Sequence, residues 1–104
     1  MVQTLSSIRS LEDVKRQLQE LKPTLRKQFN EETIDIFGSF ARGEQTAKSD
    51  LDILVTYSGT VSLFTIYDLK QYLKRKLRIK VDVISKQFLN KHIKDQVLKE
   101  AVAV

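Results

Sequence analysis

The sequence predicts an α/β domain in which a small β-sheet is flanked by helices, in the order α(α)βαβαβα. Three short apolar runs rich in isoleucine, leucine and valine are typical of strands. Segments with an apolar residue every three or four positions separate them, which is typical of helices. The chain has 104 residues, 41% hydrophobic and 30% charged. We therefore expect a single folded domain over residues 1–104.

The first helical segment has a clear start. Ser10 can cap it, and Asp13 approximates a capping box with Asp in place of the usual Glu. Its apolar residues recur at spacings of three and four, at Leu11, Val14, Leu18 and Leu21. Because Pro23 has no amide hydrogen, we expect a break near Lys22 and a second short helix from Pro23 to about Phe29.

The first strand and a tight turn follow. Asn30 can end the preceding helix in a left-handed conformation, and a strand is expected at about residues 33–37. Gly38 then makes a turn into a short helix over residues 39–42, which Gly43 stops.

The second half of the chain repeats the alternation. A polar loop over residues 44–49 leads into a strand at about residues 50–57. A helix at about residues 62–77 and a strand at residues 80–84 come next. Ser85 can cap a last helical region, whose apolar positions are Leu89, Ile93, Val97 and Ala101.

Composition excludes several kinds of chemistry. The chain has no cysteine, which removes disulfides, thiolate nucleophiles and cysteine zinc sites. The single histidine, His92, fits a surface or core-edge position better than catalysis. No apolar run approaches the roughly 20 residues of a membrane span, and residues 1–10 have no secretory pattern, so we expect a cytoplasmic protein without a membrane contact.

The formal net charge is +5, and much of the excess lies near one helix. These cations can simply form the solvated side of an amphipathic helix; a site for phosphates or other polyanions and a partner interface are the alternatives. No aromatic-studded motif accompanies them, so we do not expect direct nucleic-acid binding. The residues are Lys70, Lys74, Arg75, Lys76, Arg78 and Lys80.

Three aspartates carry much of the functional signal. Residues i and i+2 of a strand share one face, so Asp50 and Asp52 should project together. Asp82 lies in the later run, and Asp52 and Asp82 are flanked by apolar residues, where an unpaired buried charge is costly. Adjacent carboxylates repel unless a cation lies between them, and such oxygen ligands suit magnesium together with substrate phosphates.

The turn before these aspartates can bind phosphate. Gly38 permits close approach of the backbone to a ligand, and Ser39 adds a hydroxyl at the start of a helix. An ordinary strand–turn–helix with Ser39 as its cap is the alternative. Arg42 can bind phosphate in a bidentate manner or pair with Glu44, and Lys48 is the other cation nearby.

The pattern Gly38-Ser39, ten residues, Asp50-x-Asp52 and a later strand with Asp82 resembles the nucleotidyltransferase superfamily related to DNA polymerase beta, and most of all its minimal branch. The resemblance implies a mixed sheet, and it implies that Gly38 and Ser39 bind the phosphates of ATP. Asp50 and Asp52 would then hold magnesium, expected as two ions, and Asp82 would complete the cluster and accept the proton of the attacking hydroxyl.

The acceptor is expected to come from another chain, because a bare transfer core has little concave surface to hold one. We expect AMP to move from ATP to a hydroxyl of a protein partner. The resemblance implies a partner of the HEPN type, an all-helical ribonuclease toxin modified on tyrosine, with this chain as its antitoxin. The alternatives are a non-catalytic module that neutralises the partner stoichiometrically, and transfer to a small hydroxylated molecule such as an aminoglycoside.

Overall fold

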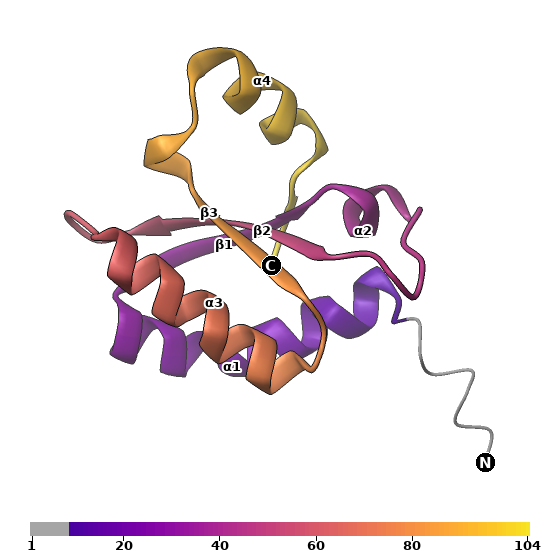
Figure 1. The fold of residues 1–104 in the computed structure, drawn as a ribbon, viewed down its shortest axis with the longest axis horizontal. Helices are drawn as coiled ribbons and strands as arrows, with labels where there is room; N and C mark the ends of the chain where they lie inside the picture. The colour runs from indigo at the N-terminus through magenta and orange to yellow at the C-terminus, as the bar shows by residue number, and fades with distance from the viewer. Residues whose placement is uncertain (1–8) are drawn as a thin grey trace.

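The computed structural model describes residues 9–104 and contains a four-stranded sheet in the order β3-β2-β1-β4 (Figure 1). β1 pairs antiparallel with both β2 and β4, whereas β2 and β3 are parallel. The mixed sheet and its flanking helices confirm the predicted fold class. The strands are β1 (Glu31–Phe37), β2 (Leu51–Tyr57), β3 (Val81–Ser85) and β4 (Val102–Ala103).

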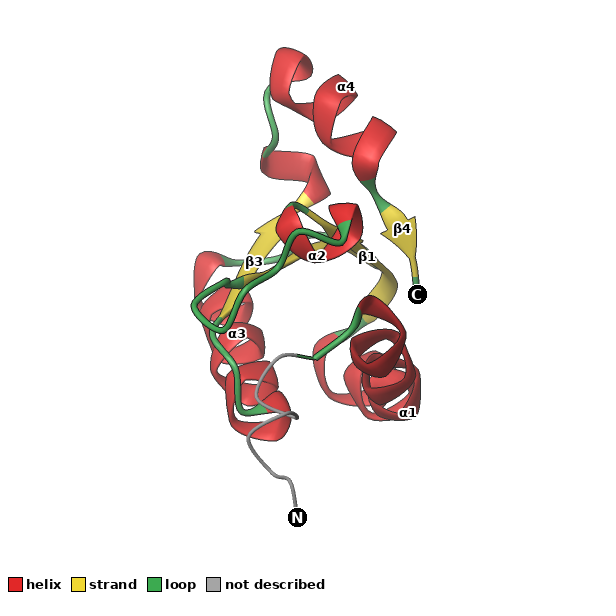
Figure 2. Cartoon of the chain, turned by 90° about the vertical axis from the view of Figure 1, so that its right-hand side faces the viewer, coloured by secondary structure: helices red, strands yellow, loops and turns green. Residues whose placement is uncertain are grey.

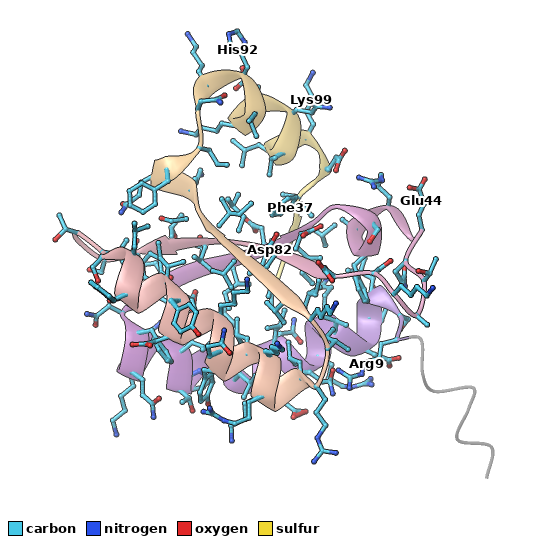
Figure 3. The ribbon with its side chains drawn as sticks, in the orientation of Figure 1. Arg9, Phe37, Glu44, Asp82, His92 and Lys99 are labelled. Carbon is cyan, nitrogen blue, oxygen red and sulfur yellow. The ribbon has the colours of Figure 1, made fainter. Side chains whose placement is uncertain are left out.

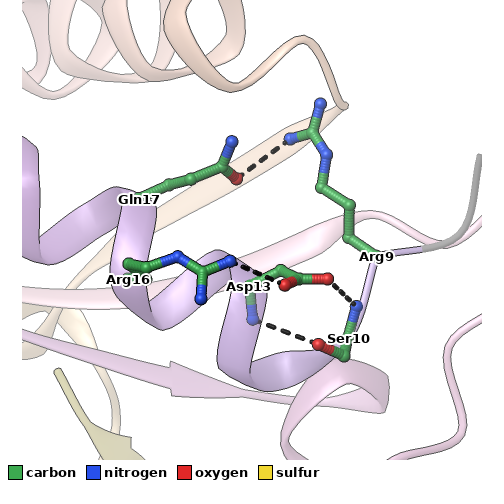
Figure 4. A network of polar contacts seen from close by, with 5 residues as sticks. All are labelled: Arg9, Ser10, Asp13, Arg16 and Gln17. Atoms are coloured by element: carbon green, nitrogen blue, oxygen red, sulfur yellow. Dashed lines mark hydrogen bonds and ion pairs between the residues drawn. The ribbon is translucent and has the colours of Figure 1, made fainter. Parts of the chain in front are cut away.

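Helix α1 (Leu11–Phe29) begins at the predicted cap. The amide of Asp13 donates to the Ser10 hydroxyl at 3.1 Å, and the Ser10 amide donates back to the Asp13 carboxylate at 3.3 Å, which closes the capping box (Figure 4). Arg16 pairs with Asp13 at 2.9 Å, and Arg9 donates to Gln17 at 3.3 Å. The first turn is thus held by side chains that the sequence places at its start.

The predicted break near Lys22 is wrong, because α1 runs through Pro23 without interruption. Proline removes one amide donor from the helix. Pro23 lies on the exposed side of α1, away from the core. Leu18 and Leu25, on either side of it, are fully buried against the sheet and α3. Their burial outweighs the lost hydrogen bond. The helix ends at Asn30, whose φ of 55° confirms the predicted left-handed cap.

One face of the sheet packs on α1 and on α3 (Leu63–Leu77), with Ser62 as the cap of α3 (Figure 1). Alternate strand residues point into this core, as the two-residue period of a strand requires. The intervening residues, Asp52 and Asp82 among them, therefore point to the opposite face. The buried strand residues of the core are Ile34, Ile36, Leu51, Ile53, Val55, Tyr57, Val81 and Val83.

The C-terminal region differs from the prediction. Ser85 ends β3 and leads into a 3-10 helix, η2 (Lys86–Phe88), without a cap bond from its side chain. Asn90 instead caps α4 (Lys91–Glu100) by accepting from the Ile93 amide at 2.9 Å. The expected helical residue Ala101 is extended, because the chain leaves α4 to pair β4 with β1.

Helix α4 lies beyond the sheet face that α1 and α3 leave open, and β4 returns the chain to the sheet edge (Figure 2). The Lys22 ammonium donates to the Val104 carbonyl at 3.1 Å, which ties the last residue to α1. None of the helices within residues 9–104 combines the length and the apolarity that crossing a bilayer requires.

Candidate functional site

The site begins at the turn between β1 and α2 (Ser39–Arg42). Gly38 has φ 76° and ψ −151°, a conformation that residues with a side chain rarely adopt. A Cβ atom on Gly38 would overlap Oδ2 of Asp52 and lie 3.2 Å from its Cγ. Glycine is therefore required both by the backbone and by the carboxylate above it, a second reason that sequence patterns did not reveal.

The parallel register of β2 and β3 places Asp52 directly beside Asp82. Asp52 is half-buried, while Asp50 is exposed immediately before β2. Burial raises the pKa of the Asp52 carboxyl, the negative charges of Asp82 and Asp50 raise it further, and Arg42 opposes them. The surroundings of Asp52 thus disfavour its charge and would favour a cation next to it.

The apolar neighbours of Asp82 suggested that it is buried, but it is exposed. Its side chain is 56% exposed, and its Oδ1 lies 3.8 Å from Nζ of Lys70. Within residues 9–104 no three acidic or histidine side chains stand close enough together to enclose a metal ion as they are. The three aspartates are neighbours, but Asp82 is paired with a lysine of α3.

The donor set nevertheless fits magnesium. Asp50, Asp52 and Asp82 offer only hard carboxylate oxygens, from the start of one strand and from the next strand. The missing Cβ of Gly38 leaves room for the carboxylate of Asp52, one of these ligands. Asp50 and Asp52 could hold the ion, and Asp82 could join them after leaving Lys70. These ligand roles stay predictions.

The structure gathers five of the six predicted site residues in one cleft of about 540 Å³. Its walls come from the end of β1, the α2 turn, the start of β2 and, on the far side, α4. Local sequence patterns do not indicate that α4 contributes to the cleft, because only the return of β4 to the sheet brings that helix here. The lining residues are Phe37, Gly38, Ser39, Arg42, Lys48, Asp50, Asp52, Gln96, Val97 and Glu100.

Arg42 is held by acids on both sides. Its Nε donates to Glu44 at 2.9 Å, and another guanidinium nitrogen donates to Glu100 of α4 at 3.0 Å. The pairing with Glu44 is the alternative that the sequence left open. Since α2 has only four residues, its dipole is small. Phosphate binding would therefore depend on backbone amides, the Ser39 hydroxyl and cations, and a phosphate at Arg42 would compete with two glutamates.

His92 lies on α4 at the end remote from the sheet, whereas Phe37 and Asp82 lie near the sheet face that α4 overlooks (Figure 3). The imidazole is exposed and is not among the residues that line the cleft. This position agrees with the surface role expected of the single histidine.

Comparison with known proteins supports the same chemistry. The chain matches the family described as Polymerase beta, Nucleotidyltransferase over residues 19–104. It is 38% identical to the protein adenylyltransferase MntA of Thermococcus cleftensis over 95 residues. The match covers 91% of this chain and 96% of that protein.

Several solved structures share the fold at 25% identity or more. One, described as a minimal nucleotidyltransferase, has a TM-score of 0.79 and 33% identity, covering 95% of this chain and all of the other. A chain of a toxin–antitoxin complex with AMP-PNP has a TM-score of 0.73 and 26% identity, covering 85% of this chain and 69% of the other. The family match and these relatives show that the chain is a nucleotidyltransferase of the polymerase beta family, within its minimal branch.

Proposed function

We propose that this chain is a magnesium-dependent protein adenylyltransferase that moves AMP from ATP to a hydroxyl of a protein partner. The observation that carries the proposal is the shared cleft, in which the Gly38–Ser39 turn adjoins Asp50 and Asp52. A phosphate-binding turn next to metal-binding carboxylates is what nucleotidyl transfer requires. The name of the Thermococcus relative and the AMP-PNP of the toxin–antitoxin complex support ATP and a protein acceptor.

In the proposed reaction the acceptor oxygen forms a bond to the α-phosphorus of ATP while the bond to pyrophosphate breaks. Gly38 and Ser39 bind the departing phosphates. Asp82 accepts the proton of the acceptor hydroxyl, since its carboxylate is exposed beside Asp52. Magnesium held by Asp50, Asp52 and Asp82 would supply positive charge at the attacking and leaving oxygens.

The proposed partner is a HEPN-type ribonuclease toxin that is modified on tyrosine and thereby neutralised. The resemblance to minimal nucleotidyltransferases implies that partner, and the similarity to a chain of a toxin–antitoxin complex supports it. The surface also suits a protein partner. Leu63, Phe64 and Tyr67 at the start of α3 are 72%, 83% and 61% exposed, and they lie within two turns of one helix. Large exposed apolar residues grouped in this way are typical of interaction sites.

The proposed function is tested by incubating the chain with ATP, magnesium and a HEPN-type protein encoded beside it. Intact-mass spectrometry should show the partner heavier by about 329 Da for each AMP added, because pyrophosphate is the leaving group. Ribonuclease activity should fall in step with the modification, at substoichiometric amounts of this chain. Inhibition of an unmodified partner at a fixed molar ratio, without ATP, would instead support the non-catalytic module.

Gly38→Ala should lower stability and ATP affinity together. The new Cβ would push the Asp52 carboxylate out of place, in addition to straining the backbone. Gly59→Ala is the matched control, because Gly59 has φ 83° but open space around its Cβ position. We expect Gly38→Ala to cost about 1–3 kcal/mol more than the control in the free energy of unfolding. ATP affinity, measured by calorimetry, should fall roughly tenfold in Gly38→Ala alone. Equal effects of the two substitutions would contradict the contact with Asp52.

A further inference from the structure

A small basic pocket lies next to the candidate metal site. Lys70 and Lys74 of α3 and Lys80 before β3 line it together with Asp50, Val81 and Asp82, and its volume is about 160 Å³. Lys70 lies 3.8 Å from Asp82, whereas no salt bridge joins Lys74 or Lys80 to an acid within residues 9–104. The pocket therefore brings three cations to the edge of the site.

This lysine pocket (Lys70, Lys74 and Lys80) is distinct from the other cations of α3. Arg75 and Lys76 lie over the ring of Tyr72, 5.6 and 5.7 Å from its centroid, and do not line the pocket. Helix geometry explains the separation, because adjacent residues project about 100° apart around the helix. The cations of this segment thus form two groups, of which only the lysines line the pocket beside Asp82.

The order of the sheet places the pocket relative to the Gly38 turn and the aspartates. The Gly38 turn follows β1, Asp50 and Asp52 belong to the start of β2, Asp82 belongs to β3, and α3 packs beside β3. Asp50 lines both the large cleft and the lysine pocket. Crossing the sheet from β1 to β3 therefore leads from the phosphate turn, past the carboxylates, to the lysines.

An in-line displacement needs the attacking and leaving groups on opposite sides of the α-phosphorus. If pyrophosphate leaves toward Gly38 and Ser39, the acceptor hydroxyl approaches from the side of Asp82. The lysine pocket is on that side. It is thus placed to contact the segment of the partner that carries the acceptor hydroxyl.

We infer that the lysine pocket binds acidic residues that flank the acceptor hydroxyl of the protein partner. The inference rests on the proposed function. The two carboxylates in the pocket are those assigned to magnesium, so a bound ion would leave the three lysine charges without acid partners and open to an anion. An acidic peptide suits the pocket better than nucleic acid, because no aromatic side chain lines it on which a base could stack.

The test uses two labelled peptides, each with one tyrosine, flanked by four glutamates in the first and by four glutamines in the second. Binding is measured by fluorescence anisotropy with magnesium and AMP-PNP present. The acidic peptide should bind more tightly, and Lys74→Gln with Lys80→Gln should weaken it roughly three- to tenfold. Arg75→Gln with Lys76→Gln removes the same amount of charge from the same region of the chain and should leave binding within about twofold.

ATP affinity is measured on the unsubstituted chain and on both double variants, and circular dichroism checks that each of the three is folded. Equal binding of the two peptides, or equal loss in both double variants, would overturn the inference while leaving the proposed function intact. A tenfold loss of ATP affinity in the Lys74 and Lys80 variant would overturn it too, by assigning the lysines to the nucleotide. Tighter binding of a single-stranded RNA of equal charge would overturn the peptide assignment. Failure of the unsubstituted chain to bind ATP would instead count against the proposed function.

Discussion

Asp52→Asn is expected to reduce AMP transfer roughly 10²–10³-fold, the effect of removing one preorganised electrostatic group from a reaction centre. Asp52 is the half-buried carboxylate of the site, held over Gly38 and next to Asp50 and Asp82. Asparagine keeps its size but cannot provide the negative charge that a magnesium ion requires. Asp50→Asn should have a similar effect, because Asp50 lines the same cleft.

The same substitution should leave the fold intact and make the metal-free protein at least as stable at neutral pH. Because the pKa of Asp52 is raised in the folded chain, the folded chain binds a proton there more tightly than the unfolded chain does. The Asp52 carboxyl therefore contributes most to the free energy of unfolding below the ordinary Asp pKa, and this contribution is lost as the pH rises through the raised pKa. Asparagine does not ionise and so avoids this loss of stability. The melting temperature of Asp52→Asn should therefore exceed that of the unsubstituted chain at neutral pH, and this difference should shrink on acidification.

Asp35→Asn is the matched control for this prediction. Asp35 also lies within a strand, β1, and also opposes an apolar residue, Leu54, yet it does not line the cleft. Its substitution should leave AMP transfer within about twofold of the unsubstituted chain, in line with most changes away from the reaction centre. Transfer that survives in Asp52→Asn, measured with labelled ATP at saturating magnesium, would contradict the metal-site assignment.

Local sequence signals predicted most of the elements for identifiable reasons. The capping box at Ser10, the left-handed Asn30 and the turn at Gly38 depend on contacts within a few residues, and all three are present. Strands β1 to β3 also follow from short apolar runs. Pro23 was misread because its cost is local, whereas the burial of Leu18 and Leu25 that offsets it is tertiary.

What the sequence could not predict depends on contacts between distant segments. The two-residue strand β4 has no pattern of its own and exists because β1 offers it a free edge. That pairing brings α4 to the cleft and Glu100 to Arg42. The exposure of Asp82 and its pairing with Lys70 likewise follow from how α3 packs beside β3, since neighbouring valines indicated burial.

Removing magnesium is expected to weaken ATP binding by roughly tenfold or more. The triphosphate would lie in a cleft that already contains Asp50 and Asp52, and Arg42 there is paired with two glutamates. Without a cation between them, the phosphates and carboxylates repel, and each like-charge pair at contact distance costs on the order of 1–4 kcal/mol. Magnesium replaces that repulsion with shared coordination.

Calorimetric titration of ATP with magnesium and with EDTA measures this difference. The double substitution of Asp50 and Asp52 by asparagine provides the decisive comparison, because it removes both the ligands and the repulsion. In that variant ATP affinity should change little between magnesium and EDTA, and binding in EDTA should be tighter than in the unsubstituted chain. Equal ATP affinity with and without magnesium in the unsubstituted chain would mean that the two carboxylates hold no ion beside the triphosphate. The phosphate turn at Gly38 would then have to bind ATP against their charge, which the positions of Asp50 and Asp52 in the same cleft make unfavourable.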